Sequence, residues 1–134
     1  MNLVPKAGIG LYDLLNRQAR KNLGLRPVSK RIVITFDDGW RDNYQHAYPI
    51  MKSLGFKGVV FLIAGKIGAD GYLTKEQIKE MAGSGFEFGS HSFTHPDLPT
   101  LSIEEKWQEI HGSKLFLSEQ LGLDIDFFCY PRGF

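Results

Sequence analysis

The sequence predicts an α/β fold in which parallel strands alternate with helices. Four short runs rich in β-branched, aromatic or other apolar residues predict the strands, at 31–36, 59–63, 86–89 and 125–130. Helical periodicity and helix-capping residues occupy the intervals between these runs. Clusters of polar residues follow the runs, at the edge of the sheet where α/β folds usually place their functional sites. A parallel sheet or part of a barrel is therefore expected.

Length and composition suit a single packed domain. The chain has 134 residues, of which 43% are hydrophobic and 23% charged. Lys and Arg number 16 against 15 Asp and Glu, without long runs of like charge, so composition argues against nucleic acid as the main partner. The apolar stretch 59–64 is too short to cross a bilayer, and residues 1–22 lack the continuous apolar segment of a signal peptide. The single cysteine, Cys129, cannot form a disulfide within the chain, so the cysteine content does not indicate the cellular compartment.

The first half of the chain predicts a helix, a strand, a divided helix and a second strand. Residues 1–30 predict an amphipathic helix followed by a linker with glycine and proline, to which no chemistry is assigned. The first strand, 31–36, ends at an acidic turn. Residues 42–54 predict a kinked or two-part helix, because Pro49 fits best in the first turn of its second half. The run 59–63 predicts a strand buried on both faces, as parallel sheets require.

Two later helices carry capping boxes at their N-termini. Thr74 with Gln77 begins the first, and Ser102 with Glu105 begins the second. The second helix is predicted to end at Gly122. Its apolar residues predict one stripe that faces the core, formed by Ile103, Trp107, Ile110, Leu117 and Leu121.

The polar residues after the first and third strands favour a metal site. Asp37 and Asp38 would be costly together in a cavity unless a cation neutralised them. His91 and His95, spaced H-x-x-x-H, can place two imidazoles on one side of a turn. One carboxylate and two imidazoles leave a fourth position for water or substrate, as in catalytic zinc sites, and the remaining aspartate could act as a base. Separately, each pattern is also consistent with an ordinary turn or a coincidence.

Four further residues could contribute to the same site or only to the fold. Trp40 is a candidate for stacking on a sugar face, with packing beneath the first loop as an equal alternative. His46 and His111 fall within helices and are interpreted as structural, and Cys129 as an inert buried thiol in an apolar strand. Two phosphate-handling classes are excluded. A receiver domain needs an acceptor aspartate after a later strand, and the second predicted strand is directly followed by none. A haloacid-dehalogenase-type phosphatase needs its two aspartates separated by one residue, whereas the two aspartates here are adjacent.

Three motifs, in this order, resemble the first three motifs of the polysaccharide deacetylases (carbohydrate esterase family 4): Thr35-Phe36-Asp37-Asp38-Gly39, His91-Ser92-Phe93-Thr94-His95 and Phe128-Cys129-Tyr130-Pro131-Arg132-Gly133. The resemblance implies a deformed (β/α) barrel, shortened here to about four parallel strands, with residues 31–134 as its N-terminal part. It also implies metal-dependent removal of N-acetyl groups from N-acetylglucosamine-containing exopolysaccharide, chitooligosaccharide or peptidoglycan. In some members the substrate is O-acetylated xylan. An extracytoplasmic or cell-envelope location is the corresponding expectation.

The resemblance also implies roles for individual residues. The residues that resemble the metal ligands are Asp38, His91 and His95. The expected ion is zinc, with cobalt, nickel or manganese as alternatives. Asp37 resembles the general base, and the backbone N–H of Arg132 resembles the group that stabilises the oxyanion. Trp40 and Tyr130 are the candidate substrate-binding residues.

Two departures from the family pattern affect the expected function. Cys129 stands where many members have an arginine that orients the base, and this form resembles the branch that deacetylates poly-N-acetylglucosamine. The family's later motifs, including a Leu-His pair that supplies the general acid, have no counterpart before Phe134, so an open sheet edge is expected. A metal- or glycan-binding module, completed by a further segment or an oligomeric partner, is therefore an alternative. A non-enzymatic oligomerising domain is a third.

Overall fold

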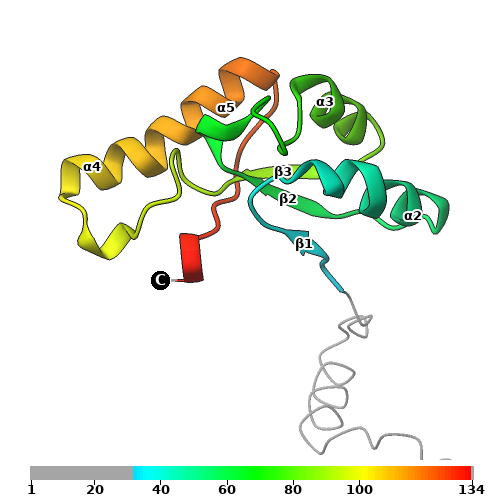
Figure 1. The fold of residues 1–134 in the computed structure, drawn as a ribbon, viewed down its shortest axis with the longest axis horizontal. Helices are drawn as coiled ribbons and strands as arrows, with labels where there is room; N and C mark the ends of the chain where they lie inside the picture. The colour runs from blue at the N-terminus through cyan, green and yellow to red at the C-terminus, as the bar shows by residue number, and fades with distance from the viewer. Residues whose placement is uncertain (1–31, 134) are drawn as a thin grey trace, which may run out of the picture. The chain divides into compact units, whose positions relative to one another are not determined.

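A three-stranded parallel sheet with helices packed against it forms the described part of the chain (Figure 1). The computed structural model describes residues 32–133, so the predicted N-terminal helix and linker lie outside the described residues. The strands are β1 (Thr35–Phe36), β2 (Val59–Leu62) and β3 (Glu87–Ser90), and they are ordered in the sheet as in the sequence. Helices connect them, as parallel neighbours require. The predicted α/β class is confirmed.

The first strand is shorter than the apolar run that predicted it. Thr35 pairs with Val59 and Phe36 with Val60, and the Val59 N–H donates to the Ile34 carbonyl at 3.0 Å. Since β2 begins at Val59, the earlier residues of the run have no neighbouring strand in the described region. The extent of β1 is thus set by its partner.

The predicted fourth strand at 125–130 is reduced to a single parallel bridge between Ser90 and Phe128. Two backbone hydrogen bonds flank this bridge. The Ser90 N–H donates to the Phe127 carbonyl at 2.8 Å, and the Cys129 N–H donates to the Ser90 carbonyl at 2.9 Å. Within residues 32–133 this segment has a partner on one side only, and Pro131 cannot donate a further ladder bond. The prediction of a regular fourth strand is therefore wrong, although the segment occupies that position.

The helix predicted at 42–54 is divided as expected. The π-helical turn η1 (Asn43–Ala47) continues into α2 (Tyr48–Ser53), and Pro49 lies in the first turn of α2. Helix α3 (Lys75–Gly83) begins with the predicted capping box, in which the Thr74 side chain accepts from the backbone N–H of Gln77.

The last helical region is one rod made of three parts. Helix α4 (Ile103–Trp107) begins with the second predicted capping box and continues through the π-helical turn η4 (Gln108–Gly112) into α5 (Ser113–Leu121). Gly122 ends the rod with a left-handed backbone, φ 67°, which glycine adopts at little cost. Short 3₁₀ turns lie at η2 (Ala64–Lys66), η3 (Leu98–Thr100) and η5 (Pro131–Gly133).

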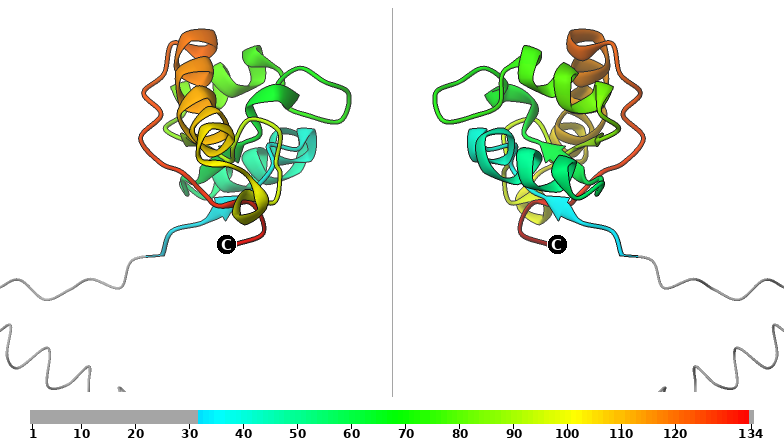
Figure 2. Two further views of the ribbon diagram at one scale, coloured as in Figure 1. Left: turned by 90° about the vertical axis from the view of Figure 1, so that its left-hand side faces the viewer. Right: turned by 90° about the vertical axis from the view of Figure 1, so that its right-hand side faces the viewer.

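The core lies between the sheet and the helices α3 and α5. These two helices contact each other, α5 also contacts β3, and Figure 1 shows both above the sheet. The side views show the segment after α5 running back along the helices past the sheet (Figure 2). The large apolar side chains that are almost fully buried include Val60, Leu62, Ile78, Met81, Leu117 and Ile125. Each contributes about 1.5–3 kcal/mol through burial, and together they hold the strand ends in place.

The predicted core-facing stripe along the α4–α5 rod is only partly correct. Leu117 and Leu121 are buried, but Trp107 is 60% exposed and Ile103 is more exposed still. The interpretation of Trp107 as a core residue is therefore wrong. The π-helical turn η4 adds one residue within the rod, which rotates the two ends relative to each other by about 100°. In addition, α4 projects beyond the sheet (Figure 1).

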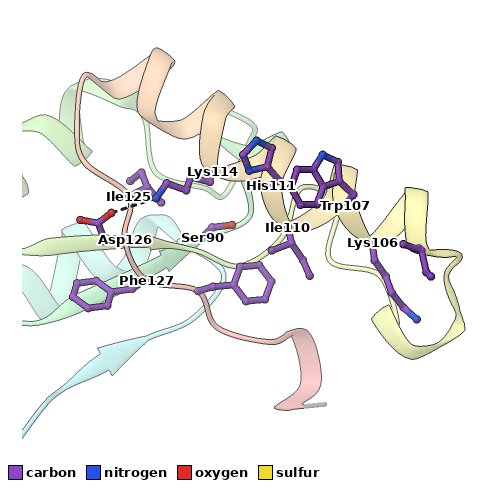
Figure 3. Close-up of a pocket in the computed structure, with 11 residues that line it drawn as sticks. Ser90, Lys106, Trp107, Ile110, His111, Lys114, Ile125, Asp126 and Phe127 are labelled. Atoms are coloured by element: carbon purple, nitrogen blue, oxygen red, sulfur yellow. Dashed lines mark hydrogen bonds and ion pairs between the residues drawn. The ribbon is translucent and has the colours of Figure 1, made fainter.

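An apolar groove of about 440 Å³ lies between this rod and the C-terminal segment. Trp107 and Ile110 line it from the rod, and the ion pair of Lys114 with Asp126, 3.3 Å long, joins its two sides (Figure 3). Ser90, at the end of β3, also lines the groove. Within residues 32–133 no helix has both the length and the apolar character needed to cross a membrane.

Candidate functional site

The three sequence-predicted metal ligands meet at the carboxyl ends of β1 and β3. Asp38 follows β1, His91 follows β3 directly, and His95 lies on the loop beyond it. The Oδ1 atom of Asp38 lies 3.6 Å from Nε2 of His91 and 3.6 Å from Nε2 of His95. The parallel register of the sheet therefore brings one carboxylate oxygen and two imidazole nitrogens together from two distant segments.

Unusual backbone conformations aim these side chains. Asp38 has φ 69°, and Ser92 and His95 have φ 66° and 64°, in the left-handed region that non-glycine residues rarely adopt. Such conformations cluster at functional sites. The Ser92 hydroxyl accepts a hydrogen bond from the His95 N–H at 3.0 Å, which closes the loop between the histidines. Gly39 follows with φ 76°, and a Cβ there would lie 2.7 Å from the Leu62 side chain.

The ring of His91 has a fixed orientation. Its side chain is 3% exposed, and its Nδ1 lies 2.9 Å from the Cys129 carbonyl oxygen. Since a carbonyl oxygen can only accept, Nδ1 carries the proton, and in the neutral imidazole the lone pair is then on Nε2, the atom that faces Asp38. Metal-ligating histidines are typically held in this way. His95 is partly exposed, and its ring packs edge-on against that of His91 with centroids 4.8 Å apart.

The second oxygen of Asp38 is bound by Trp40. The indole Nε1–H donates to Asp38 Oδ2 at 3.0 Å. The indole also stacks on the Tyr72 ring at 4.4 Å, and the two residues form an antiparallel backbone bridge. Trp40 therefore lies at the candidate site, with one face covered and 42% of its surface exposed.

Asp37 and Cys129 lie on the same site. Asp37 is exposed, and one ligand atom from each of Asp37, His91 and Cys129 lies within 4.8 Å of the others. Burial raises the pKa of the Cys129 thiol above its ordinary value, and the nearby Asp37 charge raises it further. Cys129 is only partly buried, so the expectation of a buried thiol is wrong. No local pattern placed Cys129 beside Asp37, because the two residues come from opposite ends of the domain, and only the family resemblance assigned position 129 to the surroundings of the base.

The loop between the two histidines is bound from two sides. The Gly65 N–H, just beyond β2, donates to the Phe93 carbonyl at 2.9 Å. The Glu109 carboxylate accepts from the backbone N–H groups of Phe93 and Thr94, both at 2.8 Å. It also accepts from the Thr94 hydroxyl at 2.7 Å. Sequence reasoning missed Glu109, since a glutamate within a helix carries no signal of such a contact.

The third motif lies next to this loop. Arg132 has a left-handed backbone, φ 58°, and its guanidinium lies 3.8 Å from the Asp97 carboxylate, two residues beyond His95. Tyr130 is exposed, and its ring packs edge-on against Phe128 with centroids 5.2 Å apart. The guanidinium of Arg132 thus links the C-terminal segment to the region of the histidine loop.

The two remaining histidines lie elsewhere. His46 is exposed on η1, and the ring of His111 stacks on Trp107 with centroids 4.4 Å apart. Neither belongs to the candidate ligand groups found among residues 32–133.

Comparison with known proteins finds relatives that share this region. The family model described as polysaccharide deacetylase matches residues 10–134. The YxkH protein of Bacillus subtilis (strain 168) is 39% identical over 108 residues, which cover 81% of this chain and 39% of that protein. The poly-beta-1,6-N-acetyl-D-glucosamine N-deacetylase of Staphylococcus aureus (strain MSSA476) is 32% identical over 98 residues, covering 69% of this chain and 33% of that protein.

A solved structure shares the fold. The structure of the Streptococcus pyogenes deacetylase PplD in complex with acetate matches with a TM-score of 0.75 and 34% sequence identity. The match covers 92% of this chain and 54% of that one. This chain therefore spans well under two thirds of the length of these relatives.

Proposed function

Because this chain belongs to the polysaccharide deacetylase family, we propose that it supplies the base and the metal ligands of a hydrolase that removes N-acetyl groups from N-acetylglucosamine-containing polysaccharide. One observation carries the proposal. Asp38 Oδ1 lies at the same distance, 3.6 Å, from Nε2 of both His91 and His95.

This donor set fits a divalent cation. Zinc binds carboxylate oxygen and imidazole nitrogen at about 2.0–2.2 Å, which places neighbouring ligand atoms about 3.3 Å apart in a tetrahedral site. The observed 3.6 Å separations are close to that value, and the His91 tautomer leaves Nε2 free to bind. Zinc is therefore the proposed ion, and cobalt, nickel and manganese are alternatives that accept the same donors.

A second set of three residues competes for His91. Asp37 and Cys129 form it together with the same histidine. We favour the set with Asp38 and His95 because Asp38 Oδ1 lies 3.6 Å from each imidazole Nε2, which is close to the ligand separation of a tetrahedral site. That choice also leaves Asp37 free for proton transfer.

Each remaining residue has a defined task. A cation held by Asp38, His91 and His95 would polarise the amide carbonyl and lower the pKa of a water molecule. The exposed Asp37 carboxylate accepts the proton of the attacking water. The backbone N–H of Arg132 is the proposed donor to the developing oxyanion. The exposed rings of Trp40 and Tyr130 offer apolar faces on which sugars can pack.

We propose poly-N-acetylglucosamine as the first substrate to test. The Staphylococcus aureus relative is named for the N-deacetylation of that polymer. Cys129, in place of the arginine that many members carry, also resembles that branch of the family. Such a substrate implies action outside the cytoplasm or at the cell envelope.

A binding module is the second candidate function. The chain covers 39% of YxkH and 33% of the Staphylococcus aureus enzyme. The Leu-His motif that supplies the family's general acid is absent from its residues. A module of this kind would bind metal or glycan, and another segment or a second copy would complete the site.

Acetate release from poly-N-acetylglucosamine oligomers in the presence of zinc tests the hydrolase proposal. It should be measured for this chain and for the longest gene product that contains it. Asp37→Asn is expected to abolish release and to retain zinc, whereas Asp38→Asn is expected to lose both. Acetate release that persists in Asp37→Asn would contradict the assignment of the base. Binding of zinc and glycan without turnover by the longest product would favour the module.

A further inference from the structure

We propose that Glu109 is a positioning residue that sets the geometry of the two histidine ligands. This inference rests on the proposed metal site at Asp38, His91 and His95. It adds a residue from the α4–α5 rod, outside the three motifs that predicted the site.

The Glu109 carboxylate binds the histidine loop through three hydrogen bonds. Oε2 accepts from the N–H groups of Phe93 and Thr94 at 2.8 Å, and Oε1 accepts from the Thr94 hydroxyl at 2.7 Å. Bonds to an ionised carboxylate are about twice as strong as those between neutral groups. One side chain therefore satisfies consecutive backbone donors in the segment that separates His91 from His95.

The loop needs an external partner because its backbone is irregular. Ser92 and His95 have positive φ angles, so no helix or strand ladder pairs the N–H groups between them. On the other side, the Gly65 N–H binds the Phe93 carbonyl, and a Cβ on Gly65 would lie 3.0 Å from that oxygen. The loop is thus clamped between the end of β2 and Glu109.

The π-helical turn explains how Glu109 faces the loop. Glu109 lies within η4, and π-helical turns inside α-helices are uncommon and frequently occur at functional sites. Just after this turn, the Ser113 hydroxyl lies 2.6 Å from that of Ser90, the residue before His91. The rod therefore forms hydrogen bonds next to both histidines. Ser113 bonds to Ser90, the residue before His91, and Glu109 bonds to Thr94, the residue before His95.

A change in this loop would move the two Nε2 atoms relative to Asp38. Both now lie at 3.6 Å from one carboxylate oxygen, and a shared ion requires that they stay there. Residues that orient metal ligands commonly change metal affinity by 10–100-fold when they are mutated. We expect an effect of this size from Glu109.

The test compares zinc affinity in two matched variants of the intact chain. Glu109→Ala is expected to raise the zinc Kd roughly 10–100-fold, measured by competition with a chromogenic chelator. Glu109→Gln, which keeps one acceptor oxygen, should show a smaller loss. Glu105→Ala is the control, because it breaks the α4 capping box and lowers the melting temperature without touching the loop. Its zinc affinity should match the wild type.

Amide hydrogen exchange provides a readout that does not depend on metal. In the zinc-free chain, the amides of Phe93 and Thr94 should exchange faster in Glu109→Ala than in wild type, while amides in the core of β2 should not. Unchanged exchange and unchanged zinc affinity in both Glu109 variants would overturn the proposal, as would an equal affinity loss in Glu105→Ala. A wild-type chain that binds no zinc would contradict the metal site itself, and the exchange rates would then decide whether Glu109 holds the loop.

Discussion

The indole N–H of Trp40 donates to Asp38 Oδ2 at 3.0 Å, while the other oxygen of the same carboxylate faces both histidines. The aspartate is therefore oriented by a residue two positions after it. Stacking on Tyr72 holds the indole in this position. The proposed sugar-binding role of Trp40 and its contact with Asp38 use different parts of the ring, so one side chain can serve both.

Replacing Trp40 by phenylalanine separates these contributions. Trp40→Phe keeps an aromatic ring on Tyr72 and removes the donor to Asp38, so the zinc Kd is expected to rise about tenfold. Chelator competition measures this change. Trp107→Phe is the matched control, because Trp107 lies exposed on α4 and belongs to neither candidate ligand group. If Trp40→Phe binds zinc as tightly as wild type, the hydrogen bond does not orient the ligand.

The two candidate ligand sets make opposite predictions. His95→Ala should lose stoichiometric zinc, because His95 belongs only to the set with Asp38. Cys129→Ser should keep it, because Cys129 belongs only to the set with Asp37. Metal analysis of the dialysed proteins measures both, with His91→Ala as the variant that loses zinc in either case. If Cys129→Ser loses zinc and His95→Ala keeps it, the ligands are instead Asp37, His91 and Cys129.

Stability should depend on the ionisation of Glu105. The Ser102 backbone N–H, and then its hydroxyl, hydrogen-bond to the Glu105 carboxylate and lower its pKa below the ordinary 4.5. A folded-state pKa below the unfolded value gives a stabilisation that is present above about pH 4.5 and is lost as pH falls through the folded-state pKa. Glu105→Gln cannot titrate. The free energy of unfolding, measured by urea titration from pH 7 to pH 3, should therefore be higher for wild type than for Glu105→Gln at pH 7, and this difference should narrow below about pH 4.5. A difference that stays constant with pH would argue against the effect.

The two ends of the α4–α5 rod should differ in their contribution to stability. Leu117 is fully buried, so Leu117→Ala is expected to cost roughly 2–5 kcal/mol of unfolding free energy. Trp107→Ala, at a mostly exposed position, removes the stack on His111 and is expected to cost about 0.5–1.5 kcal/mol. Denaturant titration measures both. If Trp107→Ala lowers the free energy of unfolding as much as Leu117→Ala does, the face of α4 that carries Trp107 is covered in solution.

Helix starts were predictable because their signals are local. The capping boxes at Thr74 and Ser102 each depend on a residue three positions later, and both are present in the structure. The division of the 42–54 helix followed from the backbone restriction of Pro49. Strand lengths were less predictable, since 31–36 and 125–130 have strand-like composition but extend only as far as a partner is available.

The residues by themselves determined the α/β class, the helix N-termini and, through three ordered motifs, the family and the set of candidate site residues. Each of these depends on neighbours within a few positions or on the identity of a side chain. Only the tertiary structure decided that Asp38 Oδ1 faces both imidazoles, that Trp107 is exposed and that Glu109 binds the histidine loop. Those relationships arise from strand register, helix rotation and hydrogen bonds between segments far apart in the chain, which no local pattern encodes.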